Sequence, residues 1–151
     1  MTISVRVAIE SVRRESSEQI SLDFQALRIQ SPDIDSAYDD WVMTEEHFRN
    51  LGSVMQDASG DLYHALHNYI GYMSVGREMI SIDIKVGRCS IDVNYVTDAI
   101  HRYYKSKVLA WWYQMRNAEM AKSYTLKADG ILEQINNLCI TRIGTLTPRY
   151  F

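Results

Sequence analysis

The sequence predicts a mainly α-helical fold: a helical bundle with one projecting antiparallel β-hairpin at about residues 79–96 and an extended C-terminal tail. Apolar residues recur at steps of three and four over residues 44–73 and 97–139, which is typical of helices that bury one face. Between Met79 and Val96 they alternate with polar residues, as in a half-buried strand. Gly144 and Pro148 then interrupt regular structure near the end of the chain.

The composition is that of an ordinary soluble globular protein. The 151 residues fit a single domain, residues 1–151, with 46% hydrophobic and 23% charged residues. No apolar run approaches the ~20 residues of a membrane span, and the charged N-terminal stretch is unlike a signal peptide. Cys89 and Cys139 form no CxxC motif, so we expect free thiols in the reducing cytoplasm.

Charge is unevenly distributed along the chain, although the net charge is only -3. Between Pro32 and Asp61 eight acidic residues accompany a single base, Arg49. From Thr97 onward eight bases accompany four acids. Two interpretations remain open: solvated faces of different elements, or complementary surfaces that meet head to tail in a ring or stack.

The N-terminal segment Thr2–Gln30 has two possible structures. Its first apolar residues alternate as in a strand, but their neighbours also suit a helix. We expect one helix over most of the segment, with strand or helix left open for residues 2–12. A loop rich in Asp, Ser and Pro follows from Ser31-Pro32 to Met43.

A second helix is expected from Thr44, a plausible N-cap that precedes Glu45 and Glu46 in the first turn. Ser59-Gly60 interrupts this helix, and a further apolar stripe continues to Met73. The sequence leaves open whether residues 44–73 form two helices or one bent helix.

The predicted hairpin turns at Gly87-Arg88, where glycine in the first position suits a type II′ turn. That turn sets every apolar residue of one strand opposite an apolar residue of the other, and a one-residue slip would destroy the match. The expected pairs are Val86 with Cys89, Ile84 with Ile91, Ile82 with Val93, and Ile80 with Tyr95.

The same register places Asp83 directly opposite Asp92, a like-charge pair that costs stability unless a base neutralises it. An isolated two-stranded ribbon is also marginal, and its edges are open to further strands. The hairpin therefore packs either on the chain's own helices or on a neighbouring subunit. Asp83, Lys85, Arg88 and Asp92 are our interface candidates on this element.

The C-terminal half predicts a helix capped by Thr97 that covers residues 98–116, and a second helix over 118–138. They could form one rod or a hairpin that breaks near Asn117, and we expect the hairpin. Residues 140–151 are then a docking strap. Its last three residues, Arg149, Tyr150 and Phe151, combine a cation with two aromatics of the kind that anchor interfaces.

Trp111-Trp112-Tyr113 is difficult to bury on one helix, because successive side chains lie ~100° apart. Two helix faces must therefore be covered. Packing within the chain is our first expectation. The alternative makes Trp111 and Trp112 part of a subunit interface, where Trp and Tyr are over-represented.

Catalytic and metal-binding patterns are weak. Asp61-x-x-His64 and Asp98-x-x-His101 have the spacing of a bundle metal site, yet both aspartates suit helix starts. No nucleophile motif or phosphate loop is present. Bases and aromatics interleave over residues 101–107 but spread around a helix. We expect no enzyme activity and no cofactor.

Three stretches give the chain a resemblance to the head-completion proteins of tailed bacteriophages, which form the ring-shaped adaptor of the head-tail connector in the neck. They are VTDAIHRYYKSKVLAWWYQM from Val96, KADGILEQINNL from Lys127 and RIGTLTPRYF from Arg142, and the resemblance covers about residues 79–151. It implies a virion subunit that is assembled in the host cytoplasm and docks on the portal protein. It further implies a dodecameric ring of copies beside other neck or tail proteins, with DNA passing through the lumen without sequence-specific binding and no membrane partner.

A second hypothesis does not use this resemblance. The chain could be a cytoplasmic helical module that binds protein or nucleic acid through the helix that carries Tyr103 to Tyr113.

Overall fold

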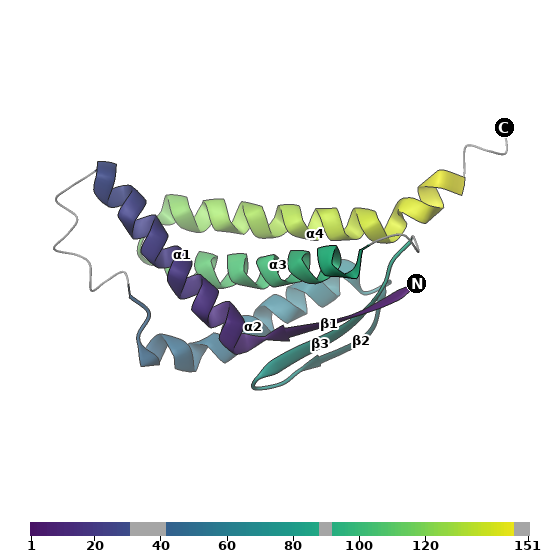
Figure 1. Cartoon of the computed structure of the whole chain (residues 1–151), viewed down its shortest axis with the longest axis horizontal. Helices are drawn as coiled ribbons and strands as arrows, with labels where there is room; N and C mark the ends of the chain where they lie inside the picture. The colour runs from purple at the N-terminus through teal and green to yellow at the C-terminus, as the bar shows by residue number, and fades with distance from the viewer. Residues whose placement is uncertain (31–41, 88–91, 147–151) are drawn as a thin grey trace.

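The structure, a computed structural model, describes residues 1–30, 42–87 and 92–146, except for the side chains of residues 29, 30 and 141–146. These residues form a three-stranded sheet and four helices (Figure 1). The order of elements is β1 (Thr2–Ala8), α1 (Ile9–Gln30), α2 (Glu45–Leu66), β2 (Ile70–Val75), β3 (Met79–Lys85), α3 (Val93–Tyr113) and α4 (Ala118–Leu146).

The helix α3 lies between α4 on one side and the sheet on the other, with α1 crossing both helices and α2 packed against α3 (Figure 1). One hydrophobic core joins these elements, with buried side chains from β1, β3 and all four helices. The prediction of a mainly α fold with an antiparallel β-hairpin is confirmed.

The sheet has the order β1-β3-β2, and both edge strands run antiparallel to β3. Its inner face is made of β-branched residues that alternate along the strands. Every second residue therefore points into the core, as the pleat requires. The pairs are Ile3 with Ile84, Val5 with Ile82, and Val7 with Ile80, all 2% exposed or less.

For residues 2–12, where the sequence leaves strand and helix both open, the structure has the strand β1 over Thr2–Ala8 and the helix α1 from Ile9. The alternation of Ile3, Val5 and Val7 was the decisive signal, because β3 offers three isoleucines at the same spacing. The chain passes from β1 into α1 without a loop, and the backbone N–H of Ile9 donates to the carbonyl of Glu78.

The hairpin exists, but the predicted partner strand is wrong. β3 pairs with β2, which precedes it, and the turn lies at Gly76-Arg77-Glu78. The N–H of Gly76 donates to the carbonyl of Met79 at 2.9 Å, and a Cβ on Gly76 would lie only 3.0 Å from that oxygen. Glycine therefore permits this tight closure. The predicted turn residue Arg88 lies outside the described residues.

Val93 and Tyr95, which were expected in the second strand, begin α3 instead. Asp92 caps this helix, since its carboxylate accepts a hydrogen bond from the N–H of Asn94 at 2.9 Å. The expected Thr97 cap is also wrong, because the Thr97 hydroxyl donates to the carbonyl of Val93 inside the helix. A local capping bond at Asp92 and burial of Val96 thus favour helix over strand.

The second helix begins as predicted, with Thr44 at the N-cap. It continues through Ser59-Gly60 as a single helix, one of the two possibilities left open, but it ends at Leu66, so the helical stripe expected up to Met73 is wrong. Ser59 is tolerated because its hydroxyl donates to the carbonyl of Met55 at 2.8 Å and lies 2.7 Å from the Tyr104 hydroxyl.

The predicted break near Asn117 is confirmed, and α3 and α4 form a helical hairpin. The side-chain oxygen of Asn117 accepts from the N–H of Met120 at the start of α4. The expected strap is wrong over residues 140–146, because α4 continues to Leu146. Gly144 costs a helix only about 1 kcal/mol, which does not stop it. Residues 147–151 lie outside the described part of the chain.

Asp23 ties α1 to both helices of this hairpin. One of its carboxylate oxygens accepts from the hydroxyls of Tyr113 at 2.8 Å and of Tyr124 at 2.7 Å, while Gln19 donates to the other. The two rings stack with their centroids 5.7 Å apart. Burial and the nearby carboxylate both raise the pKa of each phenol, so both remain donors at any physiological pH.

We predict that Asp23→Ala lowers the free energy of unfolding by about 2–3 kcal/mol, because two partly buried phenols lose their acceptor. Leu22→Ala is the matched control, since the neighbouring Leu22 is 58% exposed and should change stability by less than about 0.5 kcal/mol. Urea denaturation measures both. Equal midpoints for Asp23→Ala and Leu22→Ala would show that this carboxylate does not anchor α1.

Candidate docking surface

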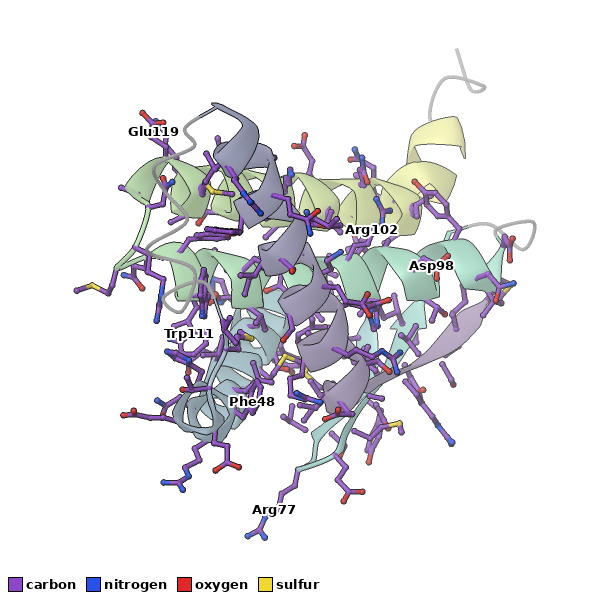
Figure 2. The ribbon with its side chains drawn as sticks, turned by 60° about the vertical axis from the view of Figure 1, so that its left-hand side comes forward. Phe48, Arg77, Asp98, Arg102, Trp111 and Glu119 are labelled. Carbon is purple, nitrogen blue, oxygen red and sulfur yellow. The ribbon has the colours of Figure 1, made fainter. Side chains whose placement is uncertain are left out.

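The consecutive aromatics of α3 are covered mainly within the chain. Trp112 and Tyr113 are 0% exposed, whereas Trp111 is only partly buried at the surface, beside His47 of α2. Trp112 lies beneath the Arg116 guanidinium at 4.3 Å. The expectation of intrachain packing is therefore confirmed for Trp112 and Tyr113. Trp112 cannot contact a partner in the folded chain, so only Trp111 remains an interface candidate on this helix (Figure 2).

A polar link beside Trp111 joins α2 to the end of α3. Nη2 of Arg116 lies 2.9 Å from Nε2 of His47, and Nδ1 of His47 lies 3.1 Å from the Thr44 hydroxyl. The backbone N–H of Thr44 also donates to Nδ1 of His47 at 2.9 Å, so this imidazole completes the capping box at the start of α2. Burial and the Arg116 charge both lower the pKa of His47, which favours the neutral imidazole.

The other residues that the sequence suggested for an interface do not form one surface in the described structure. Asp83 and Lys85 lie in β3, where Asp83 pairs with Ser4 on one side and Tyr72 on the other. The predicted opposition of Asp83 and Asp92 is wrong, because Asp92 caps α3. The candidates Arg88, Arg149, Tyr150 and Phe151 lie outside the described residues.

The two Asp-x-x-His pairs have structural partners. Asp61 accepts from Lys107 of α3 at 3.0 Å, and His101 pairs with Glu15 of α1. Among the described residues, no three His, Cys, Asp or Glu side chains gather in a way that could hold a metal ion. Over the same residues, no helix combines the length and apolarity needed to cross a membrane.

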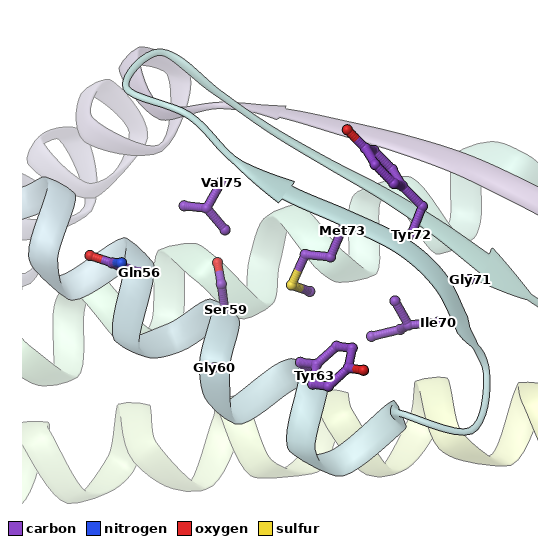
Figure 3. A pocket seen from close by; sticks show the side chains of 9 residues that line it. All are labelled: Gln56, Ser59, Gly60, Tyr63, Ile70, Gly71, Tyr72, Met73 and Val75. Atoms are coloured by element: carbon purple, nitrogen blue, oxygen red, sulfur yellow. The ribbon is translucent and has the colours of Figure 1, made fainter.

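An open, partly apolar surface lies where α2 faces the edge strand β2. A groove of about 570 Å³ separates them, and Figure 3 shows its lining side chains. Tyr63 of α2 is 50% exposed, and Tyr72 and Val75 of β2 are 56% and 39% exposed. The full lining is Gln56, Ser59, Gly60, Tyr63, Ile70, Gly71, Tyr72, Met73 and Val75.

The strand β2 is also an open edge of the sheet. It pairs with β3 on one side only, so within the described structure its other side presents unpaired backbone groups. Its sequence IGYMSV contains neither proline nor a charged residue, the usual devices that protect an edge. Groove and edge together form a surface suited to an extended partner segment, which can add main-chain hydrogen bonds and fill the apolar groove.

Sequence reasoning missed Tyr63 and Tyr72, because residues 62–73 were assigned to a helical stripe, and it made no assignment for Val75. Gly71 and Gly76 bracket a short apolar run, a pattern typical of a strand with a tight turn, and could have revealed β2. Comparisons of the chain with protein-family models, curated proteins and solved structures find no match.

The two adjacent tryptophans test the burial of α3. We predict that Trp112→Ala lowers the free energy of unfolding by about 3–5 kcal/mol, because it leaves a cavity in the core. Trp111→Ala should cost about 1 kcal/mol, because that ring is partly exposed. Chemical denaturation gives both values. If the two variants lose similar stability, the burial described for Trp112 is incorrect.

Proposed function

We propose that this chain is a non-enzymatic structural subunit of a tailed-bacteriophage neck, a head-tail connector that docks on the portal and forms a ring of copies. The observation that carries the proposal is the exposed apolar surface between α2 and the open edge of β2. Tyr63, Tyr72 and Val75 are exposed around this groove beside unpaired backbone, as expected for a site covered by another chain in an assembly. Tyr72 lies on the opposite side of β2 from Met73 (Figure 3). The resemblance of residues 79–151 to head-completion proteins supports the choice of assembly.

The shape of α4 also supports assembly. α4 has 29 residues and α3 has 21, so α4 is 8 residues longer, or about 12 Å of helix. Its C-terminal end projects from the rest of the molecule (Figure 1). In the proposed ring, this end and residues 147–151 contact a neighbouring subunit or the portal, and the hairpin β2–β3 supplies a second contact.

The alternative, a binding module that uses α3, has less support. Tyr103, Tyr104 and Tyr113 are 0% exposed, and the hydroxyls of the first two are bound to α2. A partner would reach these rings only if α3 left the core.

We predict that the double variant Tyr63→Ser/Tyr72→Ser weakens assembly at least ~10-fold, because interface tyrosines commonly contribute 1–2 kcal/mol each. Mass photometry of the purified chain, alone and with the portal ring of its virion, measures the assembled fraction. Thermal stability should change little, since both rings are about half exposed.

The matched control is Tyr95→Ser, which removes a tyrosine that is 47% exposed on α3, outside the groove. This variant should assemble as the unmodified chain does. Normal ring formation by the double variant, or an equal loss in the control, would contradict the proposal.

A further inference from the structure

A second hollow, separate from the β2 groove, lies between α1, α3 and α4. It has a volume of about 440 Å³, and three of its ten lining residues are cations: Arg102 and Lys105 from α3 and Lys127 from α4. None of the ten is Asp or Glu. We call this hollow the basic cleft. The chain as a whole carries a net charge of -3, so such a concentration of positive charge is unexpected from composition.

The cations of the basic cleft have no carboxylate partner among the described residues. Nζ of Lys105 lies 3.4 Å from the side-chain oxygen of Gln19, and Nζ of Lys127 lies 4.7 Å from the centroid of the Tyr124 ring. No described acid lies within ion-pair distance of Arg102, Lys105 or Lys127. The cleft therefore holds uncompensated positive charge, which favours an anionic occupant.

Two of the nearby acids are already engaged. Arg102 and Lys105 also border an adjoining hollow lined by Glu15 and Asp98; Glu15 pairs with His101, and Asp98 lies outside the lining of the basic cleft. Asp23, behind Tyr124, accepts from two phenols. An incoming carboxylate would thus meet the cations of the cleft directly.

Apolar surface accompanies the charge. Leu109 and Ile131 line the cleft together with Tyr124. Gly130 adds open space, because a Cβ at this position would meet no atom within 4 Å. An occupant that carries both carboxylates and apolar side chains fits this lining better than a phosphate backbone, which would leave the apolar part uncovered.

We propose that the basic cleft binds the acidic segment of residues 33–41 from a second copy of this chain. The segment DIDSAYDDW carries four aspartates interleaved with Ile34, Tyr38 and Trp41, so it matches the cleft in both charge and apolar character. The inference rests on the proposed function, because it supplies one contact between neighbouring copies in the ring.

A second copy is the better source of this segment than the chain itself. The segment joins the C-terminal end of α1 to the start of α2, and α1 lies between these two ends and Arg102 in the view of Figure 2. Docking within one chain would require the segment to pass over α1. Between two copies, the contact joins different surfaces and is therefore head to tail, as a ring requires.

Cross-linking between two differently labelled chains tests the contact. In a Cys89→Ser background, one chain carries Ser36→Cys and the other carries Gln134→Cys, at the edge of the cleft. A short bis-maleimide should then yield a covalent heterodimer at low salt, and high salt should suppress it. The control partner carries Glu119→Cys, on the same helix but outside the cleft, and should give at least ~10-fold less product, the ratio that 1.4 kcal/mol of specific contact provides.

Gly130 offers a matched pair of variants for the same assay. Gly130→Asp places a carboxylate among the three cations and should reduce the cross-link at least ~10-fold, whereas Gly130→Asn adds the same shape without charge and should preserve it. Thermal unfolding verifies that both variants fold. No heterodimer, or equal cross-linking in Gly130→Asp and Gly130→Asn, overturns the inference.

The outcomes separate this inference from the proposed function. Rings that form normally without the 36–134 cross-link would refute the basic cleft contact alone. A specific cross-link in chains that never form a ring, with or without portal, would support the contact and refute the proposed function.

Discussion

The structure depends on the burial of α3. This helix contacts α1, α2, α4 and β1, and four of its aromatic rings are fully buried: Tyr103, Tyr104, Trp112 and Tyr113. Rings that point in different directions from one helix can be buried only if several elements surround it. Their hydroxyls then fix those elements, since Tyr103 and Tyr104 bond to α2 and Tyr113 bonds to Asp23 of α1.

This arrangement determines which surface is left for partners. Because α1, α2, α4 and β1 surround α3, most of the aromatic area that the sequence suggested for an interface lies inside the chain, and Trp111 stays partly exposed. β2 is at the edge of the sheet farthest from β1, and α2 covers it incompletely, which leaves the groove beside Tyr63 and Tyr72. The apolar surface available to a partner is therefore the α2–β2 groove, whereas the sequence had suggested α3. The basic cleft between α1, α3 and α4 is a separate, charged surface.

Local signals predicted the helices well and the strand pairing poorly. The Thr44 cap, the break at Asn117 and the strand character of β3 follow from short-range chemistry. The pairing of β3 with β1 does not follow from short-range chemistry, because β1 lies more than seventy residues away in the sequence. Alternation of apolar residues alone cannot decide whether Ile3 or Ile91 is the neighbour of Ile84. The misplaced hairpin also hid the groove, since Tyr72 was assigned to a helix and Val75 to no element. Among the interface candidates that the described residues include, Trp112 is buried and Asp92 caps α3. The other three, Trp111, Asp83 and Lys85, are neither fully buried nor used as a cap.

The proposed function requires that a partner cover the open edge of β2 on assembly. Hydrogen exchange of the backbone amides in β2 tests this central claim most directly, because the measurement needs no substitution in the chain. In the isolated protein, the amides of β2 that do not bond to β3 should exchange rapidly, while those of β3 stay protected. In the proposed assembly with the portal ring, the exposed amides of β2 should become protected together with those of the adjoining turn of α2. Unchanged exchange in β2 on assembly would contradict the account.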